Sequence, residues 1–337
     1  MNSITKIDNK LFIHKEYPVC YSDENMSVQI ESPYITIEKS NNEKISYKDI
    51  NIKEIQDFKS CKYGDKILIT FGGEDALLIE NSGEYKYFNL GYRQIVTDLH
   101  IKENLLVFGC LLGKLFHFVV YDIENKKRVC QTKSIEAITL SYEFSEHYIY
   151  VLMGNSQVLC YDYSGREIWK RFEHNYIVPG FAVHKKQLIY GTKNSIKFVN
   201  QGGKSTSQEL PLNTLDKIQC TIGNNLYGVC NSRKNIFCLD LSKNQILYEV
   251  ISEETIRKIL VTKGFVSKRN SIVNVLFYST DNHLNVIDID NGEFVFQVGI
   301  QKIKEIRNNE EIIIDTYYGD THILKKAKED ESSVFEA

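Results

Sequence analysis

Three features of the 337-residue sequence predict an all-β fold built from repeated four-stranded sheets. The first is a recurring phrase, in which an apolar strand and an acidic or amide residue precede a tight polar turn and a second strand. The second is its spacing: the turn positions Asn42, Gly83, Asn125, Gly165, Gly203, Lys243 and Gly292 are separated by 41, 42, 40, 38, 40 and 49 residues. The third is that the polar gaps between strand-like runs are too short for helices. A period of about 40 to 45 residues is typical of the four-stranded blades of a β-propeller.

The clearest copies of the phrase span residues 159–169 and 285–296. Weaker copies cover residues 35–42, 77–83, 120–125, 197–203 and 237–243. Each unit also has an upstream strand rich in β-branched and aromatic residues, and the best examples are residues 66–70, 105–109, 148–152 and 273–277. Each repeat therefore contains enough strand-forming sequence for an antiparallel blade.

The turns carry their own signals. The pairs Asn291-Gly292 and Ser164-Gly165 supply the positive φ angles that a short hairpin needs. The acids Asp122, Asp162, Asp240 and Asp288 share one repeat position. Four acids at equivalent positions predict a structural role, in which each carboxylate bonds the amides of its own turn.

We expect eight blades, with seven as the alternative because residues 18–33 are irregular. Beyond the seventh hairpin lies a further strand pair, residues 311–318 and 321–325, which needs another strand. Residues 10–14 near the N-terminus can supply it, so that pairing of the N- and C-terminal strands closes a single propeller domain over residues 1–326. Residues 327–337, with the acidic run Glu329-Asp330-Glu331, form a tail that we expect to be frayed.

The phrase over residues 161–169, Tyr-Asp-Tyr-Ser-Gly-Arg-Glu-Ile-Trp, resembles the repeats of PQQ-like propellers. The resemblance extends as spacing over most of the chain, but the closing tryptophan occurs only at Trp169, and the Trp-Asp and Gly-His signatures of WD40 repeats are absent. The likeness to this PQQ-like and WD40-like propeller superfamily implies a disc-shaped platform and no particular chemistry.

Composition narrows the classes of function. The 41 Lys and Arg residues nearly balance 44 Asp and Glu residues, and a formal charge of −3 disfavours nucleic-acid binding through the phosphate backbone. The first residues do not look like a secretory signal, and no run of 18 apolar residues is present, so we expect a cytoplasmic protein that does not span a membrane. The 8 cysteines include no C-x-x-C pair, which predicts reduced, buried packing residues.

No motif in the chain predicts a catalytic, cofactor or metal site. Residues 201–206, Gln-Gly-Gly-Lys-Ser-Thr, end like a phosphate-binding loop, but Phe198 stands where that motif needs a glycine. Residues 288–293 resemble a calcium loop without its bidentate glutamate. The 8 histidines have no metal-ligand spacing. Ordinary blade turns explain the first two segments, and we predict no cofactor.

The candidate site is therefore a set of loops. With the strands of a blade labelled A to D outward from the axis, the D–A and B–C loops share one end of the blades, and their variable sequences make them the predicted binding face. The candidate partner-binding residues in these loops are Tyr92, Arg93, His174, Tyr176, Arg233, Lys234, His283, Tyr317 and Tyr318. Tyrosine and arginine are enriched in binding hot spots.

The leading hypothesis is a non-catalytic platform that binds another protein, either as a subunit of a complex or as the neutraliser of a toxin. One alternative is a hydrolase or lyase whose acids and histidines converge at the axis. A weaker alternative is RNA binding through the basic insertion at residues 257–269, which includes Lys268 and Arg269. For that insertion, a strand followed by a solvated connection is the simpler interpretation.

Overall fold

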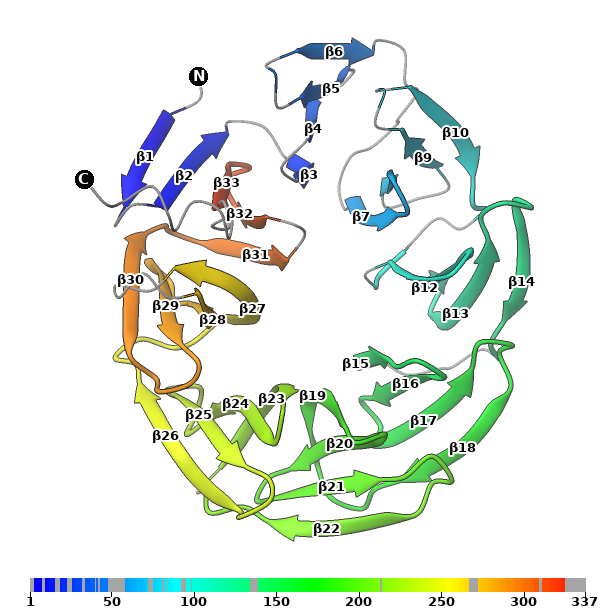
Figure 1. Ribbon diagram of the computed structural model, residues 1–337. Helices are drawn as coiled ribbons and strands as arrows, with labels where there is room; N and C mark the ends of the chain where they lie inside the picture. The colour runs from blue at the N-terminus through cyan, green and yellow to red at the C-terminus, as the bar shows by residue number, and fades with distance from the viewer. Residues whose placement is uncertain are drawn as a thin grey trace. The chain divides into compact units, whose positions relative to one another are not determined.

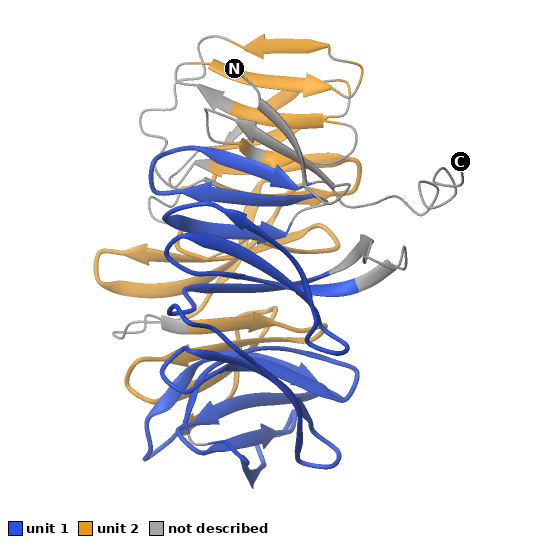
Figure 2. Cartoon of the chain, turned by 90° about the vertical axis from the view of Figure 1, so that its left-hand side faces the viewer, with its two compact units in different colours: residues 1–16, 172–337 blue, residues 17–171 orange. Residues whose placement is uncertain are grey.

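The protein is an eight-bladed β-propeller in a computed structural model (Figure 1). The structure describes residues 3–324 except residues 8–9, 16–18, 23–25, 32–33, 40, 42, 48–57, 72–74, 81, 83, 92–94, 98, 134–138, 213, 267–271 and 309–310. All the regular secondary structure in this described part is β-strand. The chain divides into two compact units, Met1–Glu16 with Phe172–Ala337 (unit 1) and Tyr17–Arg171 (unit 2), each with four blades (Figure 2).

Unit 2 holds four consecutive four-stranded antiparallel sheets. Their strands are β3 (Val19–Ser22), β4 (Met26–Glu31), β5 (Tyr34–Lys39), β6 (Lys44–Tyr47); β7 (Phe58–Tyr63), β8 (Lys66–Phe71), β9 (Asp75–Ile79), β10 (Tyr85–Asn89); β11 (His100–Lys102), β12 (Leu105–Leu112), β13 (Leu115–Asp122), β14 (Lys127–Gln131); and β15 (Thr139–Phe144), β16 (Tyr148–Met153), β17 (Gln157–Asp162), β18 (Glu167–Phe172). The irregular stretch that favoured seven blades contains β3 and β4 of a normal blade, so the seven-blade alternative is wrong.

Unit 1 holds three further four-stranded sheets and the terminal sheet. The three are β19 (Ile177–His184), β20 (Gln187–Thr192), β21 (Ser195–Val199), β22 (Ser205–Glu209); β23 (Leu215–Ile222), β24 (Asn225–Cys230), β25 (Asn235–Asp240), β26 (Gln245–Ile251); and β27 (Lys258–Val266), β28 (Ile272–Ser279), β29 (His283–Asp288), β30 (Phe294–Gly299). In each unit the first strand of a blade lies on the inside and the last on the outside (Figure 1). The basic insertion thus contributes β27, the predicted strand. Lys268 and Arg269 lie outside the described residues.

The terminal sheet joins the two ends of the chain, as predicted. It contains β31 (Ile303–Asn308), β32 (Ile312–Thr316), β33 (Thr321–Leu324), β2 (Lys10–Lys15) and β1 (Ser3–Ile7), in that order. The pairing of β2 with β33 is antiparallel and matches Phe12 with Leu324 and His14 with His322. The sheet has five strands where four were expected, because β1 pairs with the outer side of β2. The predicted tail over residues 327–337 lies outside the described residues.

The hydrophobic core lies in layers between consecutive blades. On β24 the buried Leu226 packs toward the blade that begins with β19, and the next residue, Tyr227, packs toward the blade that begins with β27. Leu276 and Phe277 on β28 alternate in the same way between two layers. Successive side chains of a strand point to opposite faces, and a blade between two others buries both faces, so its middle strands are continuously apolar.

In the seven blades other than the terminal sheet, the outer hairpin is the recurring phrase of the sequence. The carboxylate of Asp162 accepts a hydrogen bond from the Ser164 amide at 2.9 Å, and that of Asp240 accepts one from the Ser242 amide at 2.8 Å. In the same way, the carboxylate of Asp122 accepts a hydrogen bond from the Asn125 amide, and that of Asp288 accepts one from the Asp290 amide, both at 2.9 Å. The hydroxyl and amide of Ser242 lower the pKa of Asp240. The predicted structural role of these four acids is confirmed.

The segment that resembles a phosphate-binding loop is one of these hairpin turns. It joins β21 to β22, and Asn200 takes the place of the aspartate: its side-chain oxygen accepts hydrogen bonds from the amides of Gly202 and Lys204, both at 3.0 Å. Gly203 has the positive φ of 80° that the turn requires. These amides are satisfied within the turn, and no helix follows, so the segment is a blade turn.

Candidate protein-binding surface

The D–A and B–C loops of unit 1 lie at the same end of their blades, because antiparallel strands reverse direction at each turn. We call these loops the loop edge. It comprises the described residues 173–176, 193–194, 210–212, 214, 231–234, 252–257, 280–282, 300–302 and 317–320. The described loops of the outer hairpins and of the A–B turns lie at the opposite end.

Backbone hydrogen bonds tie the loop edge together from blade to blade. The Ile256 amide donates to the Arg233 carbonyl at 2.9 Å, and the Arg257 amide donates to the Ser279 carbonyl at 2.8 Å. The chain of contacts continues with Lys302 N to Asp281 O at 3.0 Å and Tyr317 N to Lys302 O at 2.9 Å. The loops from Arg233 to Tyr317 are therefore fixed by their neighbours, and side chains on these blades keep a defined spacing.

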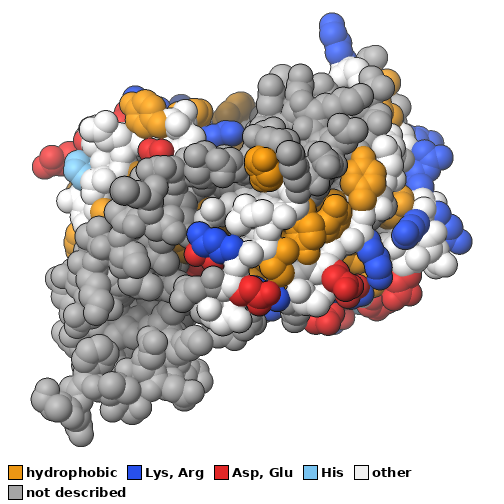
Figure 3. Space-filling view, turned by 90° about the horizontal axis from the view of Figure 1, so that it is seen from above, with side chains coloured by type: hydrophobic (Ala, Val, Ile, Leu, Met, Phe, Trp, Pro, Cys, Tyr) orange, Lys and Arg blue, Asp and Glu red, His pale blue; other side chains and the backbone are white. Residues whose placement is uncertain are grey.

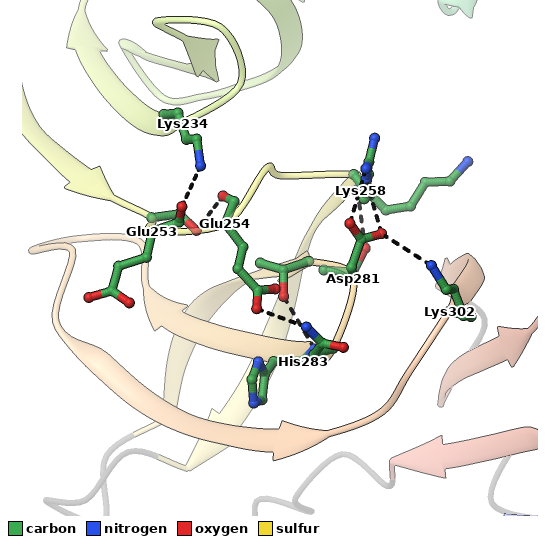
Figure 4. Close-up of polar contacts among 12 residues, drawn as sticks. Lys234, Glu253, Glu254, Lys258, Asp281, His283 and Lys302 are labelled. Atoms are coloured by element: carbon green, nitrogen blue, oxygen red, sulfur yellow. Dashed lines mark hydrogen bonds and ion pairs between the residues drawn. The ribbon is translucent and has the colours of Figure 1, made fainter.

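Polar side chains reinforce the middle of the loop edge (Figure 4). The Lys234 ammonium donates to the Glu253 carbonyl, and Asn282 donates to the Glu254 carboxylate at 2.9 Å. Arg257 binds both oxygens of Asp281, at 3.0 and 3.3 Å, and lowers the pKa of that carboxyl. Exposed ion pairs of this kind contribute little to stability, so their main effect is to orient the loops.

The most exposed large hydrophobic side chains of the described residues all lie on or beside the loop edge. Phe172 and Ile251 end the outer strands β18 and β26, and they are 59% and 77% exposed. Tyr176, Tyr317 and Tyr318 lie in the loops and are 68%, 70% and 69% exposed. The other described exposed hydrophobics are each less than half exposed. Apolar side chains gathered at one end of the blades are typical of a binding surface.

The structure places six of the nine predicted site residues on this edge, and a seventh, His283, directly beside it as the first residue of β29. Tyr176, Tyr317, Tyr318, His174 and Arg233 present exposed side chains. Lys234 and His283 are partly buried, and Lys234 is engaged with Glu253, so these two support the loops. Tyr92 and Arg93 lie outside the described residues. That any of the nine contacts a partner stays a prediction.

Sequence reasoning missed Phe172 and Ile251, which end strands that the repeat assigns to the outer side of a blade. It also missed Lys217 on β23, and it noted Lys258, the first residue of β27, only as part of the basic insertion at residues 257–269. Their position in the repeat could have indicated them. Phe172, Ile251 and Lys258 lie where a strand meets a D–A loop, and Lys217 lies close to such a loop.

A titratable group with an unusual environment lies in unit 2, on the inner strand β15. Burial raises the pKa of Glu143 to about 7. Nearby, the Tyr163 hydroxyl donates to the Ser145 carbonyl at 2.7 Å, and His100 stacks on Phe144 with ring centroids 4.6 Å apart. Burial, and then the charge of Lys102, lower the pKa of His100. These contacts hold the two inner strands β11 and β15 together.

We predict that Glu143→Gln stabilises the protein above neutral pH. The folded-state pKa is raised, so between pH 4.5 and 7 the unfolded chain releases a proton that the folded chain retains, and wild-type stability falls as pH rises. The stability difference between variant and wild type should grow from near zero at acidic pH to about 2 kcal/mol above neutrality. Urea unfolding at pH 5 and pH 8 measures it, and an equal effect at both values would contradict the assignment.

Four observations on the described residues concern metal binding, surface charge, membrane helices and thiols. No group of three or more His, Cys, Asp or Glu side chains there is placed to hold a metal ion. The described Lys and Arg side chains are interspersed with Asp and Glu on the face shown in Figure 3. No helix of the described part is long and apolar enough to cross a membrane. The seven cysteines whose side chains the structure describes form no disulfide with one another, and burial raises the pKa of Cys160 and Cys230 to about 12, which keeps these two thiols protonated.

Comparison with known proteins supports the fold. No family model and no curated protein matches this chain. Among solved structures, the computationally designed protein Ika8 superposes with a TM-score of 0.67 at 12% identity, covering 93% of this chain and 98% of the other. BamB from Moraxella catarrhalis gives 0.63 at 9% identity, covering 96% and 100%. Sqt1 from Saccharomyces cerevisiae gives 0.63 at 10% identity, covering 92% and 95%. At these identities the likeness shows the propeller fold alone, which confirms the resemblance found in the sequence.

Proposed function

We propose that this propeller is a non-catalytic cytoplasmic platform that binds another protein through the loop edge of unit 1. The propeller fold is compatible with a protein-interaction role. The observation that carries the proposal is the concentration at one end of the blades of Phe172, Tyr176, Ile251, Tyr317 and Tyr318, the most exposed large hydrophobic side chains described. Exposure of large apolar side chains to water is unfavourable, and the free energy falls when a partner covers them.

The loop edge also has the stiffness that a binding surface needs. Its loops are hydrogen-bonded to each other through the backbone, so little conformational entropy is lost when a partner binds. Tyrosine combines a large apolar area with a hydroxyl that can still form a polar contact. The surface therefore supports recognition by apolar contact at the tyrosines and by polar contact at the charged residues that lie in the loops between them.

We expect the triple variant Tyr176→Ser, Tyr317→Ser, Tyr318→Ser to lose its partner. Each buried tyrosine at an interface contributes about 2 kcal/mol, so affinity should fall at least about 100-fold. Pull-down from the native host with mass spectrometry identifies the partner, and titration calorimetry with the purified partner then measures the dissociation constant.

The matched control is Leu247→Ser with Phe294→Ser. These residues are 46% and 48% exposed in unit 1 but lie away from the loop edge, in the middle of β26 and at the hairpin end of β30. The control should bind like wild type. If the control loses the partner and the tyrosine variant keeps it, the binding surface is elsewhere and the proposal fails.

A further inference from the structure

Three cationic residues lie near the centre of the loop edge, on segments that backbone hydrogen bonds tie together. Lys217 lies on the inner strand β23, Arg233 in the β24–β25 loop, and Lys258 at the start of the inner strand β27. The Arg233 amide donates to the Asp216 carboxylate at 2.8 Å, and its carbonyl accepts from the Ile256 amide at 2.9 Å. Arg233 is thus bonded to Asp216, which precedes Lys217, and to Ile256, which lies two residues before Lys258.

The side chains of these three residues have no ion pair among the described residues, unlike their neighbours. On the same edge, Arg257 and Lys302 share the Asp281 carboxylate, and Lys234 reaches the Glu253 carbonyl. Lys217 is partly buried, and its pKa is lowered by burial first and then by the positive charges of Lys258 and Arg233. Like charges held close together and partly out of water are unfavourable until an anion joins them.

An apolar side chain lies at the outer end of the same blade. Ile251 pairs with Asn235 at the end of β26, and the loop from Ile251 to Lys258 crosses from the outermost strand of one blade to the innermost strand of the next. Four adjacent strands span about 14 Å, which is the reach of four to five extended residues. One extended peptide segment can therefore cover both ends of this loop.

We propose that Lys217, Arg233 and Lys258 form a carboxylate-binding site that receives an acidic segment of the partner protein, with Ile251 contacting an apolar residue of that segment. The inference rests on the proposed function and names the chemistry of the partner. Guanidinium and ammonium groups from three segments form charge-assisted hydrogen bonds to carboxylates, and the three cations are already held together before binding. Opposite charges also speed the encounter of the two proteins.

The test uses the full chain and fluorescein-labelled deca-glutamate in fluorescence anisotropy at about 20 mM salt, where charge interactions are weakly screened. The site variant is Lys217→Gln, Arg233→Gln, Lys258→Gln. The control variant is Lys185→Gln, Lys186→Gln, Lys204→Gln, which removes three exposed cations from turns at the opposite end of unit 1. We expect binding at least tenfold weaker in the site variant and within twofold of wild type in the control.

A second probe tests the apolar contact. A decapeptide of seven glutamates followed by three leucines should bind wild type several-fold more tightly than deca-glutamate, and Ile251→Ser should remove the gain. Circular dichroism and thermal unfolding check folding. We expect the site variant to melt no lower than wild type, because it loses like-charge repulsion. If it does unfold, Lys217→Met alone, which keeps the volume of the side chain, replaces it.

Two results overturn the inference. One is equal weakening, or no weakening, of deca-glutamate binding in the site and control variants. The other is binding of inorganic pyrophosphate at the three cations, measured by calorimetry, without binding of deca-glutamate, which would indicate a site for small anions. The proposed function is tested separately: it is contradicted if the triple tyrosine variant still binds the natural partner as wild type does.

Discussion

Gly180→Ala is expected to lower the free energy of unfolding by about 4 kcal/mol or more, the largest effect of any single substitution considered. Gly180 lies in a bulge of β19 with a φ of +100°. A Cβ atom added there would lie 1.8 Å from the carbonyl oxygen of Ile218 on β23, and 2.8 Å from its carbon. The overlapping atoms of Ile218 belong to the backbone, so no side-chain rotation relieves the overlap, and the inner strands β19 and β23 must separate.

Two other glycines of unit 1 separate the causes. Gly223 also has a positive φ, of 59°, but an added Cβ would have no atom within 4 Å, so Gly223→Ala should show only the backbone cost of about 1 kcal/mol. Gly299 has neither restriction, and Gly299→Ala should change stability by less than about 0.5 kcal/mol. Urea midpoints rank the three variants. Equal midpoints for Gly180→Ala and Gly223→Ala would show that β19 and β23 are not in contact at this point.

Removal of residues 1–16 is expected to give the second large effect, a fall in melting temperature of about 10 °C or more. The deletion takes away β2 and leaves β33 as an unpaired edge, although Leu324 and Ile323 of β33 are 1% and 2% exposed in the intact protein. An open sheet edge loses its ladder of hydrogen bonds and becomes a template for aggregation.

Deletion of residues 1–8 is the matched control. It removes only β1, which pairs with β2 on the outer side of the sheet, and should lower the melting temperature by a few degrees at most. A synthetic peptide of residues 9–17, added to the protein that lacks residues 1–16, should restore much of the loss by pairing with β33. Differential scanning fluorimetry of the four samples is the measurement. Equal melting of the two deletion variants would show that β2 contributes no stability.

The sequence predicted the architecture well because each blade repeats the same local chemistry. The hairpin aspartates Asp122, Asp162, Asp240 and Asp288 bond their own turns, and such contacts between residues close in sequence are visible without a structure. The N-terminal strand was found by a similar argument, since the last strand pair needed a partner. The extra strand β1 was missed, because nothing in the period requires a fifth strand.

The binding surface was predictable only in outline. The loops that hold Tyr176, Tyr317 and Tyr318 follow from the repeat, because turn positions in a blade determine the end at which a loop emerges. The position of these loops was therefore determined by the sequence alone. Tertiary structure alone decided that Phe172 and Ile251 remain exposed at the ends of their strands, and that Lys217, Arg233 and Lys258 come together from three segments. Exposure and charge proximity depend on which blades pack side by side, and a period along one chain carries no record of the distances between side chains on different blades.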